Sequence, residues 1–244
     1  MRRILFQWRG FTVWSYPAML YIGLVVGVVA GNAAAHAAGI DALRVYVATL
    51  VLIPAALIGA RLLYVASEWP RYRGNLRRIW NRSNGGAAMY GGLALALAFS
   101  WPLLAALDLS FGGFWDVTTF TILVGMIFTR VGCLLNGCCA GRPSRGWCSV
   151  NLPNHLGVWE RRIPTQCLEA GWAAVLLVLA IAFWRRLPFP GALFLLATAG
   201  YAGGRLLLES ARERQRGASA FTLYHALSLV MIILSVAGLA AWPK

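Results

Sequence analysis

The stretch Tyr16–Ala35, YPAMLYIGLVVGVVAGNAAA, decides the fold class, because none of its 20 residues is charged. About 20 apolar residues in an α-helix cross the hydrocarbon core of a bilayer. Three arginines precede the stretch and three alanines end it, so a cleaved signal peptide is an alternative interpretation. Gly23, Gly27 and Gly31 favour a retained helix, because small residues at every fourth position allow close packing against another helix.

Six more apolar runs of similar length follow, so the sequence predicts about seven transmembrane helices. Of the 244 residues, 59% are hydrophobic and 12% are charged, whereas soluble domains have about 25% charged residues. We therefore predict an all-α polytopic membrane protein, with residues 1–244 as a single integral membrane domain. The further runs are Leu43–Ala66, Ala88–Leu107, Phe114–Leu135, Cys167–Trp184, Gly191–Leu208 and Phe221–Trp242.

The formal net charge is +14, from 22 basic and 8 acidic residues, and every basic residue except Lys244 is arginine. A GC-rich genome would produce the same bias, but arginine also binds phosphate as a rigid, always charged fork. The arginines lie in short loops between apolar runs and form no continuous basic face, which argues against nucleic acid as a partner. Anionic membrane lipid is the more natural partner.

Ionisable residues in membrane helices are costly and therefore mark candidate sites. Near the end of the sixth run, Arg205, Glu209 and Arg212 are spaced i, i+4 and i+7, which predicts that they share one helical face. This face would offer two guanidinium groups separated by a carboxylate. The alternative is a ladder of ion pairs within one helix.

A second candidate is the segment Arg130–Pro143 at the end of the fourth run. We predict an irregular backbone whose N–H groups between Gly132 and Gly141 bind an anion together with Arg130. The alternative is an arginine that extends to the membrane surface and is followed by a plain turn.

Two weaker candidates lie at the beginnings of helices. Gln166 and Glu169 are three residues apart and would share a helix face directed into a cavity, although glutamate in a first turn is also a common favourable charge. In Gly85–Leu93, two Gly pairs surround Tyr90. An aromatic anchor at the membrane interface is the alternative for Tyr90.

The five cysteines are an odd number, and four of them lie between Cys133 and Cys148. Their spacing fits neither a disulfide framework nor the paired ligands of a structural zinc site, and only His155 is near as another ligand. Buried free thiols in place of small residues are the preferred interpretation. We therefore predict no metal site and no cofactor.

Taken in order, these segments resemble the prolipoprotein diacylglyceryl transferase family over most of the chain. The order and spacing of the segments carry the resemblance, because each segment alone is a weak match. The matching residues are Tyr16 in the first run, Arg61 in the second, Gly91 and Gly92 in the third, Arg130, Gly132, Asn136 and Gly141 in the fourth, Arg162, Pro164, Gln166 and Glu169 around the start of the fifth, and Tyr201, Arg205, Glu209 and Arg212 in the sixth.

Departures from the family pattern fall on reactive positions and leave the fold inference intact. Tyr90 stands where the family has His, Cys133 replaces Asn, Cys138 replaces Glu, Ile163 replaces His and Leu168 replaces Tyr. A phenol is a weaker base than imidazole for a thiol proton at neutral pH. Either Tyr90 is assisted by nearby arginines, or another group such as Glu169 accepts the proton, or the acceptor differs.

The resemblance implies transfer of the diacylglyceryl group of phosphatidylglycerol to the lipobox cysteine thiol of a prolipoprotein signal peptide, forming a thioether and releasing glycerol phosphate. The helices would surround a polar lipid-headgroup cavity in the bacterial cytoplasmic (inner) membrane. Arg130 and Arg205 would hold the phosphate, with Tyr90 and Glu169 as further catalytic residues. The implied substrate-binding residues are Tyr16, Arg61, Gly91, Gly92, Gly132, Asn136, Gly141, Arg162, Gln166, Tyr201, Glu209 and Arg212.

Two arguments predict opposite orientations of the protein in the membrane. The positive-inside rule places the arginine-rich loops in the cytoplasm, whereas an enzyme acting on exported proteins should open its site to the outer face. We give the resemblance more weight, because functional arginines distort a charge count. A reporter fused after Lys244 distinguishes the two and should be active in the cytoplasm.

Three other functions stay open. The chain is either a divergent relative with another acceptor, or a relative that binds phosphatidylglycerol without turnover, or a non-catalytic anion-binding or transport protein with a thiol-rich sensor loop. Substitution of Arg130 or Arg205 should abolish product formation in an enzyme. A sensor should respond chiefly to loss of Cys138, Cys139 and Cys148.

Overall fold

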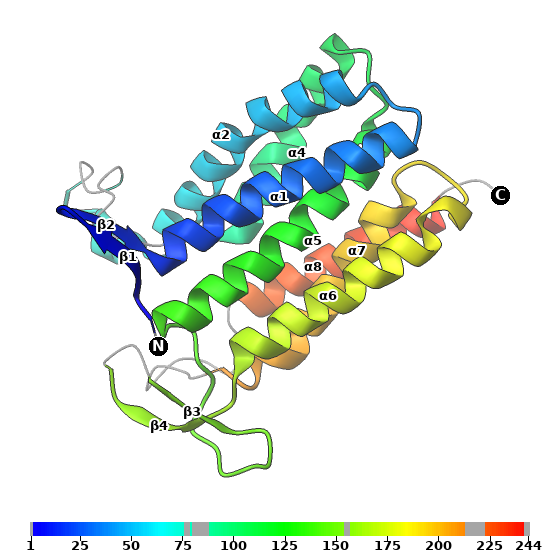
Figure 1. Ribbon diagram of the computed structural model, residues 1–244. Helices are drawn as coiled ribbons and strands as arrows, with labels where there is room; N and C mark the ends of the chain where they lie inside the picture. The colour runs from blue at the N-terminus through cyan, green and yellow to red at the C-terminus, as the bar shows by residue number, and fades with distance from the viewer. Residues whose placement is uncertain (1, 76–78, 80–87, 154–156, 213–222, 242–244) are drawn as a thin grey trace. The chain divides into compact units, whose positions relative to one another are not determined.

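The computed structural model describes residues 2–75, 79, 88–153, 157–212 and 223–241, and Figure 1 shows its element order. Seven long helices dominate these residues, joined by one short helix, one 3₁₀ turn and two hairpins. The helices are α1 (Ser15–Ala37), α2 (Ala42–Ser67), α3 (Trp69–Tyr72), α4 (Met89–Ala106), α5 (Phe111–Asn136), α6 (Thr165–Phe183), η3 (Trp184–Arg186), α7 (Ala192–Glu209) and α8 (Leu223–Ala240). The strands are β1 (Ile4–Trp8), β2 (Phe11–Trp14), β3 (Val150–Pro153) and β4 (Trp159–Arg162).

Six helices among the described residues are long and apolar enough to cross a membrane: α1, α2, α4, α5, α6 with its 3₁₀ extension, and α7. The apolar part of α8, His225–Ala240, is shorter. Each of the seven predicted runs overlaps one of the long helices. The prediction of an all-α polytopic membrane protein is confirmed.

The chain divides into two compact units. The first unit contains Met1–Ala34 and Trp115–Lys244, and the second contains Ala35–Phe114. The single integral membrane domain stays a prediction.

In the first unit, the small-residue stripe of α1 packs closely against α5. A Cβ atom on Gly27 would lie 2.6 Å from the carbonyl oxygen of Thr121, and one on Gly23 would lie 2.6 Å from Cβ of Phe128. Gly31 faces Val117 and Thr121 in the same way. The helix backbones therefore approach as the spacing predicted, which favours α1 as an integral part of the folded protein.

The helices α6, α7 and α8 of the first unit lie side by side (Figure 1). Trp172 of α6 donates a hydrogen bond from Nε1 to the carbonyl oxygen of Gly200 on α7, at 3.0 Å. The missing side chain of Gly204 makes room for the same indole ring. Asp116 of α5 accepts hydrogen bonds from the backbone N–H groups of Gly191 and Phe194, at 2.7 and 3.0 Å, and so caps the first turn of α7. These contacts fix α6 and α7, which carry most of the candidate site.

In the second unit, α2 packs against α4 through glycines. A Cβ atom on either Gly59 or Gly91 would clash with the carbonyl oxygen of the other residue. A Cβ atom on Gly92 would lie 2.7 Å from the carbonyl oxygen of Ala56. Close helix packing therefore accounts for the glycines at positions 91 and 92.

Two antiparallel hairpins were not predicted from the sequence. In the first, β1 pairs with β2 across Arg9 and Gly10, which both have positive φ, at 45° and 85°. Two such residues are typical of the tight turn that joins two strands. In the second, β3 pairs with β4, with Val150 opposite Arg162.

Candidate active site

Three helices of the first unit bring charged side chains together near their ends. Arg130 lies six residues before the end of α5, Glu169 four residues after the start of α6, and Arg205 four residues before the end of α7. At 1.5 Å per residue these positions are about 6–9 Å inside the helix ends. The charged groups therefore lie toward one end of helices that are long and apolar enough to cross a membrane.

The carboxylate of Glu169 is the centre of the site. Its Oε2 atom lies 2.5 Å from Nε of Arg130, and its Oε1 atom lies 3.1 Å from Nη1 of Arg205 and 2.8 Å from Nη2 of Arg212. The Glu169 side chain is only 3% exposed, and those of Arg130 and Arg205 are 15% and 10% exposed. One buried carboxylate thus gathers three guanidinium groups, two of them from separate membrane helices.

A second carboxylate completes the group. Glu209 Oε2 lies 3.4 Å from Nη2 of Arg205 and 3.6 Å from Nε of Arg212. These side chains, which we call the Glu169 cluster, are Arg130, Glu169, Arg205, Glu209 and Arg212. Three positive and two negative residues give the cluster a formal charge of +1. Because unbalanced charge is costly away from water, the cluster favours a further anion.

Arg212 reaches the cluster by a different route from the one predicted. We expected Arg205, Glu209 and Arg212 on one helical face, but α7 ends at Glu209. Arg212 instead forms an antiparallel β-bridge with Gly141, which returns its side chain to Glu169. Burial alone would lower the pKa of Arg212, but the carboxylates of Glu169 and Glu209 raise it overall.

We predicted that backbone N–H groups between Gly132 and Gly141 bind an anion. This prediction is wrong for the N–H groups that already donate hydrogen bonds within the protein. The helix α5 continues through Asn136, so the first part of the segment is helical. Beyond it, the N–H groups of Gly137, Cys138 and Gly141 donate to carbonyl oxygens within the protein, at 3.2, 3.1 and 2.9 Å. These donors hold the loop together and are not directed at a ligand.

Gly141 is needed where three chain segments meet. Its N–H donates to the carbonyl oxygen of Ile163, and the next N–H, of Arg142, donates to the carbonyl oxygen of Ala211, both at 2.9 Å. A Cβ atom at Gly141 would lie 2.6 Å from the Ala211 oxygen and 2.8 Å from the Ile163 oxygen. Both obstacles are backbone atoms that cannot move aside independently.

Replacing Gly141 with alanine should therefore destabilise the protein by about 1–3 kcal/mol, the usual cost of overpacking. The measurement is thermal unfolding of the detergent-solubilised protein. Gly146→Ala is the matched control, because the nearest atom to its added Cβ would be Ser144 Oγ at 3.4 Å. Equal stability of Gly141→Ala and Gly146→Ala would contradict this packing.

The first residues of α6 anchor the loop that follows α5. Thr165 Oγ1 donates to the carbonyl oxygen of Cys139 at 2.7 Å, and Gln166 Nε2 donates to that of Cys138 at 2.6 Å. The other amide atom of Gln166, Oε1, is buried and has no hydrogen-bond partner among the described residues. Gln166 Oε1 is therefore available to a bound molecule, and the role of Gln166 in binding substrate stays a prediction.

Arg162 is buried and holds the loop that follows α5. It donates from Nη1 to the carbonyl oxygen of Gly141 at 3.3 Å and from Nη2 to Glu160 Oε2 at 2.8 Å. These contacts support a positioning role. Its predicted role in binding substrate stays a prediction.

Four other predicted residues of the first unit lie near these elements. Tyr201 is buried on α7, one turn before Arg205, and interacts electrostatically with Arg130. Gly132 allows α5 to approach α1, since a Cβ atom there would lie 3.0 Å from Cβ of Met19, and Tyr16 lies beside it with its Cα at 3.5 Å. Asn136 ends α5 beside Cys138.

The remaining candidates belong to the second unit, and their catalytic or binding roles stay predictions. Tyr90 is buried in the first turn of α4, at 7% exposure. Arg61 donates from Nε to the carbonyl oxygen of Ile79 at 2.8 Å, and its guanidinium lies 5.7 Å from the ring centroids of both Tyr64 and Tyr72. Gly91 and Gly92 have the packing function described above. Gly85, Gly86 and His155 lie outside the described residues.

Sequence reasoning did not single out Thr165 or Asp116 for a function, and it considered Cys139 only as part of a thiol-rich sensor loop. Cys139 is exposed, and hydrogen bonds from the Cys133 and Cys138 thiols, together with the nearby cations of Arg212 and Arg130, lower its pKa. Asp116 could have been recognised from the sequence, because an acidic residue in a long apolar run needs a partner. Its partner, the start of α7, lies 75 residues away in the chain.

These features define an integral membrane protein whose helices enclose a net cationic site near their ends. The family model for prolipoprotein diacylglyceryl transferase matches residues 3–241, and the chain belongs to this family. The family resemblance seen in the sequence is thus confirmed, and the family is one of transferases.

Relatives named phosphatidylglycerol-prolipoprotein diacylglyceryl transferase cover most of the chain. One from Dehalococcoides mccartyi is 30% identical over 195 residues, which are 79% of this chain and 74% of the relative. One from Clostridium kluyveri is 24% identical over 245 residues, covering 97% and 94%. One from Clostridium botulinum is 27% identical over 194 residues, covering 77% and 76%.

Proposed function

We propose that this protein transfers the diacylglyceryl group of phosphatidylglycerol to the lipobox cysteine thiol of a prolipoprotein. The observation that carries the proposal is the Glu169 cluster, with its formal charge of +1 near the helix ends. A phosphodiester with one negative charge balances this cluster. The names of the relatives contain the same lipid donor, phosphatidylglycerol, and the same acceptor, a prolipoprotein.

In the proposed reaction the thiol sulfur attacks the glycerol carbon that carries the phosphate ester. A carbon–sulfur bond forms, the carbon–oxygen bond to phosphate breaks, and its electron pair leaves with glycerol phosphate. Negative charge therefore grows on the phosphate as the bond breaks. Preorganised guanidinium groups stabilise such charge strongly in a site that excludes water.

Arg130 and Arg205 are the proposed phosphate ligands. They contact different oxygen atoms of Glu169, at 2.5 and 3.1 Å, and come from α5 and α7. This arrangement would let them hold a headgroup from two sides through the N–H groups that do not contact a carboxylate. Glu209, 3.4 Å from Arg205, would hold that guanidinium in place.

Glu169 and Tyr90 were the two candidates for accepting the thiol proton. Both oxygens of Glu169 already contact guanidinium groups, so we assign Glu169 a positioning role. Tyr90 is then the proposed proton acceptor, in its ionised phenolate form. Gln166, with its buried and unpaired Oε1 atom, is proposed to bind a donor group of the substrate.

The proposal also names the setting of the enzyme. Its partners are phosphatidylglycerol, the prolipoprotein signal peptide with its lipobox cysteine, and the surrounding membrane lipid. Its location is the bacterial cytoplasmic membrane, and the activity should sediment with that fraction. No cofactor is part of the proposed reaction, because a thiolate and a phosphate leaving group suffice.

The test measures glycerol phosphate released by the purified protein from phosphatidylglycerol in mixed micelles. Release is expected with a lipobox peptide and not with the same peptide in which cysteine is replaced by serine. No release in either case from folded protein would overturn the proposal. If glycerol phosphate is released at the same rate with and without the peptide, the acceptor is a group other than the lipobox thiol.

A further inference from the structure

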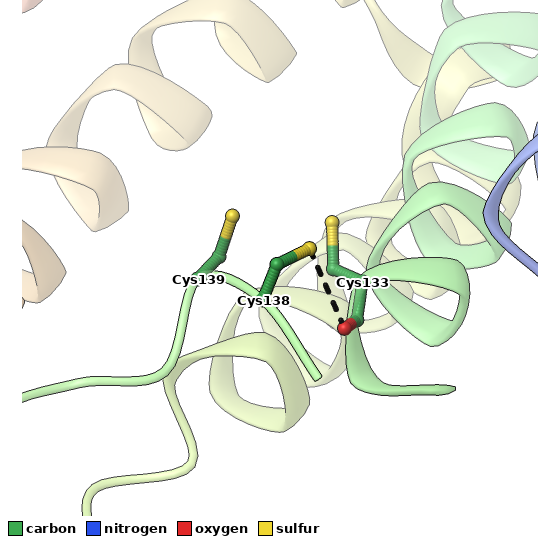
Figure 2. Close-up of side chains that lie close together, drawn as sticks. All are labelled: Cys133, Cys138 and Cys139. Carbon is green, nitrogen blue, oxygen red and sulfur yellow. Dashed lines mark hydrogen bonds between the residues drawn. The ribbon is translucent and has the colours of Figure 1, made fainter. Parts of the chain in front are cut away.

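Three cysteine side chains converge where α5 ends. Figure 2 shows Cys133 on the last turns of the helix and Cys138 and Cys139 in the following loop, with their sulfur atoms gathered on one side. All three sulfur atoms lie within 4.8 Å of one another. None of the three residues is in a disulfide. We call these residues the thiol cluster.

The spacing of the sulfur atoms is close to that of a metal site. Thiolate ligands bind zinc at about 2.3 Å, so three of them around one ion lie about 4 Å apart. The thiol cluster needs a closure of less than about 1 Å per pair to reach this geometry, which side-chain rotation supplies. Soft thiolate ligands select Cu(I) and Zn(II) over harder cations.

Backbone contacts hold the sulfur atoms in this arrangement. The carbonyl oxygens of Cys138 and Cys139 accept hydrogen bonds from Gln166 and Thr165, at 2.6 and 2.7 Å. The N–H of Cys138 donates to the carbonyl oxygen of Cys133 at 3.1 Å, which folds the loop back on the helix. The fold therefore fixes the backbone of the cluster, and only the side-chain rotamers need to adjust around an ion.

Cys139 has a backbone conformation that its side chain does not favour. Its φ of 62° lies in the left-handed region, where a residue with a Cβ atom is strained. Such strain persists only where the surrounding structure fixes it, and it is concentrated at functional sites. The Cys139 sulfur lies within 4.8 Å of the other two sulfur atoms in this conformation.

Burial and charge suit an ion that enters from solvent. Cys133 is buried, Cys138 is partly buried and Cys139 is exposed, so the cluster has one open end. The cationic Arg130 and Arg212 lie near Cys139. They would offset the negative charge of three thiolates bound to a mono- or divalent ion.

We propose that the thiol cluster binds one soft cation, Cu(I) or Zn(II), through the sulfur atoms of Cys133, Cys138 and Cys139. This departs from the sequence-based interpretation of free thiols without metal. The sequence lacked the paired short spacing of known zinc motifs, and the turn at Gly137 brings the three sulfur atoms together instead. The proposal does not depend on the transferase reaction.

The experiment titrates the purified, reduced protein in detergent under anaerobic conditions. Cu(I) is supplied as its bicinchoninate complex and Zn(II) with 4-(2-pyridylazo)resorcinol, so that uptake is read from the loss of the coloured chelate. We expect one equivalent of at least one ion to bind. Cys138→Ser and Cys139→Ser should each weaken binding at least about 10-fold, whereas Cys148→Ser and Cys167→Ser, which remove exposed free cysteines outside the cluster, should not change it.

A second measurement on the unchanged protein counts the ligands directly. The thiolate charge-transfer band of bound Cd(II) should report three thiolates per ion. Two or fewer thiolates per ion would overturn the proposal. So would no uptake of either ion, uptake by Cys139→Ser equal to that of the wild type, or equal loss in Cys148→Ser.

Discussion

Arg130→Ala should release glycerol phosphate from phosphatidylglycerol about 100–1000-fold more slowly than the wild type, the usual loss when one preorganised donor to developing charge is removed. The guanidinium of Arg130 is 15% exposed and held 2.5 Å from Glu169, so its orientation is fixed before substrate binds. Water that enters the space left by the alanine variant is neutral and mobile, so it cannot replace a fixed positive charge. The measurement is initial rate at saturating lipobox peptide.

Arg130→Lys should recover little of this activity. Lysine keeps the positive charge but replaces a planar fork with a single ammonium group, which cannot contact Glu169 and a phosphate in the same way. A charge effect alone would predict near-complete rescue. Activity of the lysine variant within about threefold of the wild type would therefore contradict bidentate phosphate binding by Arg130.

Arg186→Ala is the matched control for both variants. It removes the same kind of side chain from the first unit, but Arg186 is exposed beside the ring of Phe183 at the far end of α6. Its activity should equal that of the wild type. An equal loss in Arg186→Ala and Arg130→Ala would show that overall charge, and not the Glu169 cluster, determines the rate.

The positions of the helices could be predicted closely, because each membrane helix needs the same length of apolar sequence. A span of about 20 apolar residues is readable from composition alone. The fourth run was predicted at Phe114–Leu135 and the helix is Phe111–Asn136; the fifth was predicted at Cys167–Trp184 and the helix is Thr165–Phe183. The ends differ by a few residues, because polar residues such as Thr165 begin a helix outside the apolar run.

The first hairpin shows a signal that was present but not used. The segments ILFQW and FTVW are rich in apolar and aromatic residues and are separated by Arg9 and Gly10. Two such runs around a two-residue turn with glycine predict a hairpin.

The candidate site was predictable within one element and not between elements. The i, i+4 spacing of Arg205 and Glu209 was enough to foresee their ion pair. No spacing rule could foresee that Glu169 would contact Arg130, which lies 39 residues earlier and on another helix. The order of segments in the family implied only that both residues belong to one site, because it groups residues that pattern alone leaves separate.

The prediction of an anion-binding backbone failed because hydrogen bonds within the protein already use the N–H groups of the loop. A glycine-rich segment can bind an anion only if its N–H groups stay unpaired. In this loop Gly141 donates to Ile163 and Cys138 donates to Cys133. A sequence shows that glycine permits an unusual conformation, but it does not show which carbonyl oxygens will lie within reach.

Glu169→Gln should destabilise the protein by about 3–5 kcal/mol, the usual cost of removing one partner from a buried ion pair. The amide keeps the size of the side chain but raises the formal charge of the Glu169 cluster from +1 to +2. Three guanidinium groups then face each other without their shared counterion. Thermal unfolding in detergent should show the loss, and transferase activity should fall at least about 100-fold because Arg130 and Arg205 are no longer held together.

Added phosphatidylglycerol separates this electrostatic explanation from a simple packing defect. An anion that binds only the folded state stabilises it by mass action, and the variant has the larger excess of positive charge. Its unfolding temperature should therefore rise more with phosphatidylglycerol than that of the wild type, while the neutral lipid diacylglycerol should have no such effect. Glu68→Gln, which neutralises an exposed carboxylate at the end of α2, should change neither stability nor the response to lipid. If Glu169→Gln unfolds at the wild-type temperature, the three arginines do not depend on this carboxylate, and the headgroup site must be organised by other residues.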